Sequence, residues 1–539
     1  MVDFELETMK KVLTIASALV LSTGAAFSQG LADTYKYVPN GDLNGTARSM
    51  SMGGAFGALG GDISVLNSNP AGLAVYRSSE VVATADVSMV SAKSNWLGNG
   101  TTADKTKFNF DNIAYVGYFP TGNDSGLLSW NVGFSYNRLK NYSRNYSLRG
   151  SGDMGASLAD YVAARANKGG LTPSDIDFRK DGNGNITYDP YESVGDWLSV
   201  LSNDAGFLNY NGKQYESSLR STAGIPYTRS NTEMHVQESG AVDQYALAFG
   251  TNISDFLLLG ATVSITDLRY DLYSYYAEDY ASNKNSYIEL ENGLTTKGTG
   301  YGINIGAICR PIDFLRVGVA YNSPTWYKMT DYYDANGASD IESLPKKYEA
   351  NSPQGAYSKY KFRTPDKWIF SAAAIFGQTA LLSVDYEVMN YRRMYLSDDY
   401  GNANIETNNE VDQKLGISNT LRVGAEVKVT PQFAVRAGAS WSGCGMSSTL
   451  RDGNTEVITV GTLPHYTLTN NITNYTVGLG YRFTPQFYVD LACVLKTVKE
   501  DAYTFSTLYS DSGETMVKSS PASLKTSSTR VALTLGYKF

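Results

Sequence analysis

Residues 48–73 of this chain read Arg-Ser-Met-Ser-Met-Gly-Gly-Ala-Phe-Gly-Ala-Leu-Gly-Gly-Asp-Ile-Ser-Val-Leu-Asn-Ser-Asn-Pro-Ala-Gly-Leu. The stretch is nearly uncharged, and its many glycines allow close backbone approach to other segments. Asn69-Pro70 predicts a turn, because proline fixes its own φ and keeps the preceding residue out of the α region. The chain that follows has the pattern of β-hairpins. We therefore expect residues 29–79 to be a compact plug inside a β-barrel of residues 80–539, although these residues alone equally fit a subdomain packed on a soluble β domain.

The composition narrows the class of protein. Only 18% of the 539 residues are charged, against about a quarter in a typical soluble domain. The chain has 40 tyrosines, a residue that favours strands and membrane interfaces. The net charge is −8 and no long basic run occurs, so we expect no nucleic-acid partner.

The N-terminal residues have the pattern of an export signal. Met9-Lys10-Lys11 precedes an apolar run from Val12 to Leu21, and Ala26-Phe27-Ser28 precedes Gln29 as a small-x-small cleavage site. The apolar run is too short for a transmembrane anchor. Residues 1–28 are therefore predicted to be a signal peptide, and the three cysteines of the chain are too few and too scattered for a disulfide framework.

The end of the chain shows the strand pattern most clearly. One face of the last strand is apolar and the other is polar or small; the apolar residues are Val531, Leu533, Leu535, Tyr537 and Phe539. Strands of membrane barrels alternate in this way between lipid and lumen. A last strand that ends in an aromatic residue resembles the insertion signal of bacterial outer-membrane barrels, so Phe539 is the candidate for that signal.

The same alternation predicts fourteen strands, an even number that is typical of a closed barrel. They are residues 80–91, 109–119, 128–149, 241–252, 256–279, 294–309, 314–333, 362–376, 380–397, 412–429, 433–443, 469–483, 487–508 and 524–539. Short turns and long loops alternate between them, and the longest loop covers residues 150–240. A soluble β-sandwich also alternates polar and apolar residues, but it has no reason to sort its loops by length. The predicted fold is therefore an all-β, 14-stranded antiparallel transmembrane barrel with an N-terminal hatch in its lumen.

The hatch and the strand count together resemble one known family. Gly-Thr-Ala-Arg-Ser-Met-Ser-Met-Gly-Gly-Ala-Phe at 45–56, followed by Asn-Pro-Ala-Gly-Leu at 69–73, is similar to the long-chain fatty-acid transporter family of outer-membrane barrels (FadL/TodX type). The resemblance implies a bacterial outer-membrane location with the long loops outside, and passive uptake of a hydrophobic small molecule. It also implies hatch or gate residues, which are Gly53, Gly54, Phe56, Asn69, Pro70 and Ala71. The ligand would leave sideways into the outer-membrane lipid at a kink in the third strand, for which Gly133 is the candidate.

A second function class stays open. The chain could use the same fold as a structural subunit of a multi-protein outer-membrane complex, with loop 150–240 as the docking surface for a protein partner. A general porin fits less well, because the plug would obstruct it.

Other chemistry has little support in the sequence. Asp181-Gly182-Asn183-Gly184-Asn185-Ile186-Thr187 resembles part of a calcium loop, but Arg179 and Pro190 would occupy two ligand positions, so we expect a turn. His235 and His465 are predicted to lie in outer loops without catalytic partners. We therefore expect no enzyme, no cofactor and no metal. Arginines in the lumen phase, such as Arg422 and Arg436, are expected either to form internal salt bridges that seat the hatch or to bind an anionic headgroup.

Overall fold

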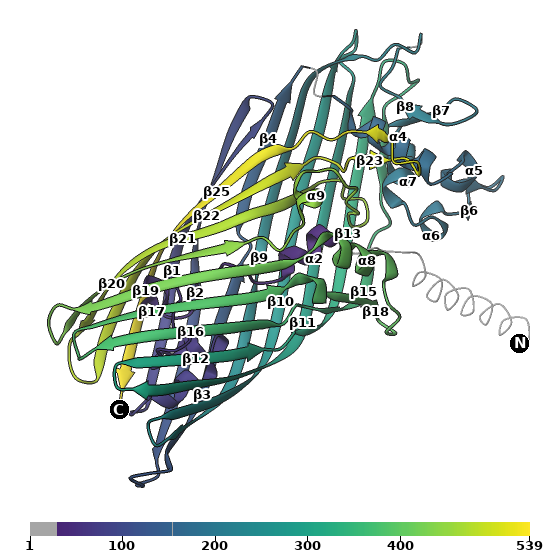
Figure 1. The fold of residues 1–539 in the computed structure, drawn as a ribbon. Helices are drawn as coiled ribbons and strands as arrows, with labels where there is room; N and C mark the ends of the chain where they lie inside the picture. Colours follow the sequence, from purple (N-terminus) through teal and green to yellow (C-terminus); the bar gives the residue numbers. More distant parts are fainter. Residues whose placement is uncertain (1–29, 153–154, 222) are drawn as a thin grey trace, which may run out of the picture.

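The computed structural model describes residues 30–152, 155–221 and 223–539, and the predicted signal peptide at 1–28 lies outside them. The chain forms the expected 14-stranded antiparallel barrel, which closes where β1 pairs with β25 (Figure 1). In chain order the wall consists of β1 (Glu80–Trp96), β2 (Asn99–Pro120), β3 (Leu127–Asn141) with β4 (Arg144–Ser151), β9 (Thr228–Ile253), β10 (Leu257–Ala281), β11 (Tyr287–Ile312), β12 (Leu315–Asn322) with β13 (Trp326–Asp340), β15 (Ala356–Arg363) with β16 (Lys367–Phe376), β17 (Ala380–Asn390) with β18 (Tyr395–Asp398), β19 (Ile417–Lys428), β20 (Phe433–Gly443), β21 (Tyr466–Arg482), β22 (Phe487–Tyr503) and β25 (Ala522–Lys538).

The alternation in sequence becomes an inside and an outside. On β10, Val263 and Ile265 are exposed on the outer face, whereas Thr262 and Ser264 between them are buried in the lumen. Phe249, Val477 and Leu535 continue the exposed apolar band on other strands. A closed sheet leaves no unpaired edge in the bilayer, so this apolar band can face lipid tails.

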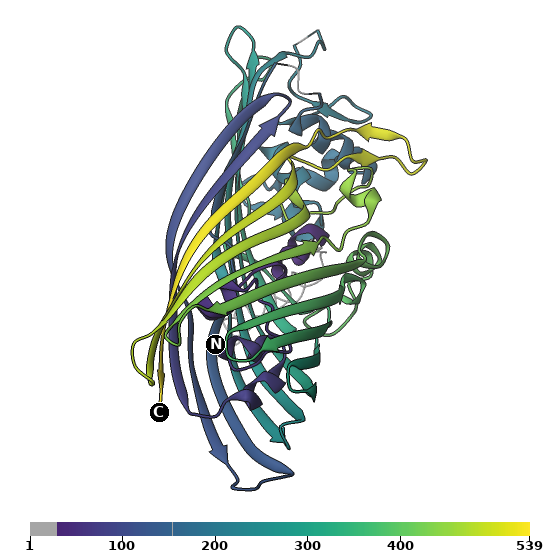
Figure 2. The ribbon, with the colours of Figure 1, turned by 60° about the vertical axis from the view of Figure 1, so that its left-hand side comes forward.

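The wall is much taller on one side than on the other (Figures 1 and 2). β9 and β11 have 26 residues each, whereas β16 has 10. A tilted strand crosses a bilayer with about 9–11 residues, so the upper halves of β9 to β11 stand outside the membrane.

Two boundaries differ from the sequence prediction for this reason. The strands that flank loop 150–240 continue to Ser151 and begin again at Thr228. His235 consequently lies within β9 rather than in an outer loop. Above the membrane the outward residues are polar, and the inward ones, such as Met234 and Val236 of β9, are apolar and pack against the cap. The lipid-facing apolar alternation that we used to place the strand ends is therefore absent there.

The segment between β4 and β9 folds into a cap. Its elements are α4 (Leu158–Lys168), α5 (Pro173–Ile176), β5 (Arg179–Lys180), β6 (Ile186–Tyr188), α6 (Pro190–Ser193), α7 (Trp197–Asp204), β7 (Leu208–Tyr210) and β8 (Tyr215–Ser217). Later outer loops add β14 (Tyr348–Asn351), η3 (Tyr391–Arg393), α8 (Ile405–Lys414), α9 (Ser448–Arg451), β23 (Leu508–Tyr509) and β24 (Thr515–Val517).

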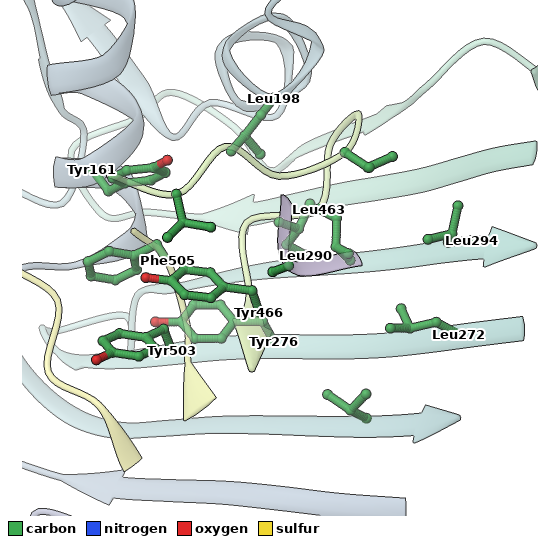
Figure 3. Packing of buried hydrophobic residues seen from close by; sticks show 14 of the residues in the cluster. Tyr161, Leu198, Leu272, Tyr276, Leu290, Leu294, Leu463, Tyr466, Tyr503 and Phe505 are labelled. Carbon is green, nitrogen blue, oxygen red and sulfur yellow. The ribbon is translucent and has the colours of Figure 1, made fainter. Parts of the chain in front are cut away.

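One large core joins the cap to the top of the lumen. Figure 3 shows Tyr161 and Leu198 of the cap near Leu290 of β11, with Phe505 and Tyr466 between them. The rings of Tyr161 and Phe505 stack with their centroids 5.2 Å apart. The outer end of the lumen is therefore filled with apolar and tyrosine side chains.

Residues 30–79 precede the first wall strand and lie inside the barrel. They form α2 (Leu31–Tyr37), α3 (Ala47–Ser51), η1 (Ile63–Asn67) and η2 (Pro70–Val75). Nearly all of these residues are buried, which matches the expected hatch. None of the described helices is long and apolar enough to cross a membrane.

Candidate functional site: the hatch and the lumen beside it

The hatch is held together by side-chain caps. Thr46 accepts a hydrogen bond from the Ser49 amide at the start of α3, and its hydroxyl donates to Asp62 at 2.7 Å. Asp62 in turn accepts from the Ser64 amide at the start of η1. Short polar side chains at helix starts satisfy amides that otherwise have no partner, so two distant turns become one unit.

Asn69 links the hatch to the wall. Its Oδ1 accepts from the Ala71 amide at 3.1 Å and caps η2, with Pro70 at the first helical position. Its Nδ2 donates to the Gly57 carbonyl at 2.7 Å and to the Ala307 carbonyl of β11 at 3.3 Å. Ala71 is fully buried against Leu258 and Ile308 of the wall. The Asn-Pro-Ala turn therefore lies directly against β10 and β11.

The wall has glycines where this turn touches it. A Cβ on Gly260 would lie 2.3 Å from the Pro70 carbonyl group, and one on Gly306 would lie 1.9 Å from Asn69 Oδ1. A Cβ on Gly318 would lie 2.7 Å from the Gly57 carbonyl oxygen. Only glycine allows backbones to approach this closely. The glycines of the hatch stand out in the sequence, whereas the role of these wall glycines does not, because their partners are distant in the chain.

The other predicted hatch residues lie on the opposite side of the lumen. Gly53 has a φ of +64°, and its Cβ would meet the backbone of Ala439 and Val423 within 2.9 Å. Gly54 has a φ of +75° and faces the Arg422 side chain. Phe56 is buried, with the Arg48 guanidinium 5.3 Å from the centre of its ring. A left-handed φ strongly favours glycine at both positions.

Salt bridges connect the hatch to the lumen wall. Arg48 of α3 pairs with Glu426 at 3.0 Å, and Glu426 also pairs with Arg436 at 2.6 Å. Arg422 pairs with Glu387 at 3.1 Å. The Gly57 amide donates to Asp385 at 2.9 Å. These buried charges pair with each other, and the contacts of Arg48 and Gly57 anchor the hatch to the wall. Internal salt bridges that seat the hatch are one of the two roles expected for the lumen-facing arginines.

Cavities flank the hatch segment from Val38 to Asn44. One of about 170 Å³ lies between this segment and the wall at β2, β3, β22 and β25. A second of about 180 Å³ lies on the side of β11, β13, β16 and β17. The first cavity has apolar residues such as Val90 and Ile472, and charged residues such as Lys140 and Glu238.

The wall beside the first cavity is incompletely paired. β1 and β2 pair through to Trp96 and Asn99, but the pairing of β2 with β3 ends at Asn112 and Asn137. Above that point, side chains bridge the two strands: Asn141 donates to Asn109 at 2.7 Å. The upper part of β2 therefore has a free main-chain edge toward β3.

The role of Gly133 as a kink at a lateral opening stays a prediction. Gly133 pairs in register with Val116 and Ala248. The irregularities of the third strand lie elsewhere, with register shifts against β9 between Leu127 and Ser129 and between Arg138 and Lys140, and a break at Tyr142 and Ser143 between β3 and β4. A Cβ on Gly133 would lie 3.2 Å from the Leu73 side chain, so a small residue is needed there for packing against the hatch.

The remaining sequence candidates lie away from the lumen cavities. Phe539 is 62% exposed next to Tyr115 and Tyr537, and its role in insertion stays a prediction. Asp181 accepts hydrogen bonds from the amides of Asn183 and Asn185, so its carboxylate closes the β5–β6 turn. His465 is buried below the cap, and His235 contacts Ser147 on the outer wall.

Comparison with known proteins identifies the fold. No family model and no curated protein matches the chain. Among solved structures, a FadL homologue of Pseudomonas aeruginosa matches with a TM-score of 0.52 and 13% identity, over 93% of this chain and 100% of that one. The chain has the FadL fold. Two deletion variants of the TodX monoaromatic hydrocarbon channel, deltaS2S3 and deltaS2, each match with a TM-score of 0.51 and 12% identity, over 92% of this chain and 100% of theirs.

The FadL fold confirms the resemblance that the hatch motif indicated, and it is the fold of an integral outer-membrane barrel. At this level of identity the match extends to architecture and not to the ligand. Fold and function are separable, so the function has to be argued from the lumen itself.

Proposed function

We propose that this chain is an outer-membrane channel for the passive uptake of small hydrophobic molecules, gated by the hatch and with a lateral exit between β2 and β3. The observation that carries the proposal is that one cavity touches both the hatch and the free edge of β2. Asp111, Arg138 and Asn141 line this cavity and lie at the same interruption in the wall.

The outer face at the lower end of that interruption carries aromatic residues. Phe108 and Phe110 of β2 are 68% and 42% exposed, and the ring of Phe110 stacks on Tyr136 of β3. A molecule that leaves the lumen here meets the acyl-chain layer and avoids the polar headgroups. Because the strands are held by side chains rather than by a ladder, they can separate without breaking main-chain hydrogen bonds.

The size of the cavity suits a compact ligand. A cavity of about 150 Å³ is large enough to hold benzene, and the cavity beside the hatch is of about 170 Å³. A long-chain ligand would need the second cavity as well. The hatch segment from Val38 to Asn44 lies between the two, so its displacement would join them.

The test is to bridge the proposed exit. In a variant with the three native cysteines replaced, Asn109→Cys with Asn141→Cys places two thiols where the side chains now touch. A short bis-methanethiosulfonate crosslinker, which forms a disulfide with each cysteine and releases sulfinate, should abolish the uptake of radiolabelled toluene by cells that express the protein, and a reductant should restore it. Oleate, measured in parallel, asks whether a longer ligand uses the same route.

The matched control bridges two strands that are already paired. Thr420→Cys with Ser442→Cys joins β19 to β20, where the two hydroxyls are 3.0 Å apart, and should leave uptake unchanged. Undiminished uptake through the bridged β2–β3 pair would refute the lateral exit. If the uncrosslinked protein takes up neither compound faster than cells without it, the transport proposal itself fails.

A further inference from the structure

The outward residues of β11, β13 and β15 change from apolar to basic along one line across these strands. Tyr301 and Trp326 point outward opposite one another, and both are about half exposed, at 56% and 48%. Below them the outward residues are apolar, beginning with Ile303 and Ile305. Aromatic residues at such a border mark the level of the lipid headgroups.

Five cations lie at this border or directly above it. Arg363 is opposite Trp326, and in the next row outward Lys328 is opposite Lys361. In the row after that, Thr330 has Lys297 on one side and Lys359 on the other. Lys297, Lys328, Lys359, Lys361 and Arg363, called the basic patch below, therefore fall on three adjacent strands and within three rows of the border.

The dimensions follow from sheet geometry. Neighbouring strands are about 4.8 Å apart, and successive outward residues on one strand are about 7 Å apart. The patch therefore measures about 10 by 15 Å, which is the size of a phosphorylated sugar headgroup rather than of a protein surface.

In the described part of the chain, the lysines of the patch are not paired with carboxylates. Within residues 30–152, 155–221 and 223–539, none of its four lysines forms an ion pair. Two outward acids of β10 lie near the patch: Asp271 is held by Arg269 at 2.8 Å, and Asp267 lies in the row of Lys328, from which Thr299 of β11 separates it. Like charges that lie directly opposite on a sheet destabilise it, so Lys328 and Lys361 oppose folding unless an anion joins them.

Two exposed tyrosines complete the surface. Tyr332 and Tyr357 lie one row above the lysines, with ring centroids 6.2 Å apart. Lys297 Nζ lies 5.4 Å from the centre of the Tyr332 ring, and Lys359 Nζ lies 5.5 Å from that of Tyr357. Flat aromatic faces beside ammonium groups suit a sugar ring that carries phosphate.

We propose that the basic patch binds the phosphorylated sugar headgroup of an outer-leaflet glycolipid, whose acyl chains lie along the apolar wall below Tyr301 and Trp326. Lysine and arginine provide charge-assisted hydrogen bonds to phosphate, and the border residues set the headgroup at the right height. This site is on the outside of the barrel and is independent of the lumen and its transport role.

The experiment measures lipid binding to the intact barrel in a non-ionic detergent by native mass spectrometry. The probe is a glucosamine-disaccharide lipid with two phosphates, compared with the same lipid after removal of both phosphates. We expect one phosphorylated lipid per barrel, and about tenfold weaker binding in Lys328→Gln with Lys361→Gln. Lys328→Arg, which keeps the charge, should bind as the native protein does.

The control removes the same charge elsewhere. Lys93 and Lys525 also point outward and lie opposite each other, on β1 and β25, two rows above Met89, the last exposed apolar residue of β1. Lys93→Gln with Lys525→Gln should leave binding unchanged. Equal weakening in both double variants would show general attraction to positive charge and overturn the site, as would equal binding of the dephosphorylated lipid.

Two further readouts distinguish the source of the anion and guard against misfolding. Inorganic phosphate at 10 mM should not displace the lipid; if it does, the patch is a free-anion site and the lipid proposal fails. Because the double variant relieves repulsion, its urea midpoint in the absence of lipid should be equal to or above that of the native protein. A lower midpoint would mean that the lysines serve folding, which also contradicts the proposal.

Discussion

At the scale of single residues, the contact between hatch and wall depends on glycine on both sides. Gly53 has the left-handed backbone in the hatch, and Gly260 and Gly306 leave space for the hatch backbone in the wall. Buried asparagines of the wall then donate to hatch carbonyls, as Asn131 does to Leu73 at 2.6 Å and Asn322 does to Asn67 at 2.9 Å. The interface is close-packed and hydrogen-bonded, so a single added methyl group should be felt.

Gly260→Ala tests this packing. Its Cβ would lie 2.3 Å from the backbone of Pro70, so the Asn-Pro-Ala turn must move, and overpacking of this kind costs about 1–3 kcal/mol. We expect a lower urea midpoint and faster proteolysis of the hatch. Gly302→Ala on β11 is the control, because the nearest atom to its Cβ would be the Ser264 hydroxyl, at 3.3 Å, and the next ones, in Thr325 and Pro324, are at ordinary contact distance. Equal midpoints for the two variants would mean that the turn is not pressed against the wall.

His465 is a buried titratable group between the hatch and the cap. Burial, with a smaller contribution from the nearby Lys36 ammonium and against the opposing charge of Glu238, lowers its pKa from the ordinary 6.5 to about 3. The folded protein therefore keeps this imidazole neutral. The unfolded chain binds a proton below about pH 6.5 and the folded chain does not, so folding loses stability as the pH falls from 6.5 toward 3.

We predict that the urea midpoint depends on pH and that His465→Gln weakens this dependence. Between pH 7.5 and 5.5 the urea midpoint of the native protein should fall. The reason is that the free energy of unfolding decreases by up to about 1.4 kcal/mol per pH unit below 6.5. His465→Gln should reduce this slope. His235, which is partly exposed on β9, serves as the control, and His235→Gln should keep the slope. An unchanged slope in His465→Gln would show that this imidazole is not held neutral.

At the scale of elements, the cap shows what sequence patterns can miss. The polar and glycine-rich residues between Gly152 and Tyr227 suggested a loop, yet α4 begins with a capping box between Ser157 and Asp160. That signal is readable in the sequence. The sequence does not show that Leu158 and Val162 on one face of α4 are buried, because the surface that covers them comes from residues hundreds of positions later, including Phe505.

The cap also fixes the orientation of the barrel. Arg179 and Lys180 lie in the exposed β5–β6 hairpin on the cap side, whereas Lys428 and Arg482 are exposed at the short-turn end. Trypsin added to intact cells should cut after Lys180 and spare the short turns, and cell lysis should expose all four sites. Cleavage after Lys428 on intact cells, with the hairpin spared, would reverse the orientation. Docking of a protein partner on the cap stays a prediction that no observation here favours.

At the scale of the whole molecule, the barrel was predictable and its irregularities were not. The alternation of apolar and polar residues predicts the two faces of each strand; in β25, Val531, Leu533 and Leu535 form the outward face. The regular alternation of short turns and long loops indicates that the sheet closes into a barrel. The end of β2–β3 pairing at Asn112 depends on register between two strands, and no single strand contains that information. The candidate kink from the sequence was therefore Gly133, whereas the end of the pairing, where we propose the exit, lies higher on β2 and β3.

The central claim is that the hatch closes an otherwise open barrel, and single-channel conductance in planar bilayers tests it most directly. Fourteen strands enclose more space than wall side chains fill, so removing the hatch should leave a water-filled lumen. Deletion of residues 31–76 should give steady ion conductance, whereas the intact protein should be silent or flicker briefly. A deletion variant that folds, as shown by its heat-modifiable gel mobility, and is as closed as the intact protein would show that the cap alone seals the lumen and would contradict the gated-channel account.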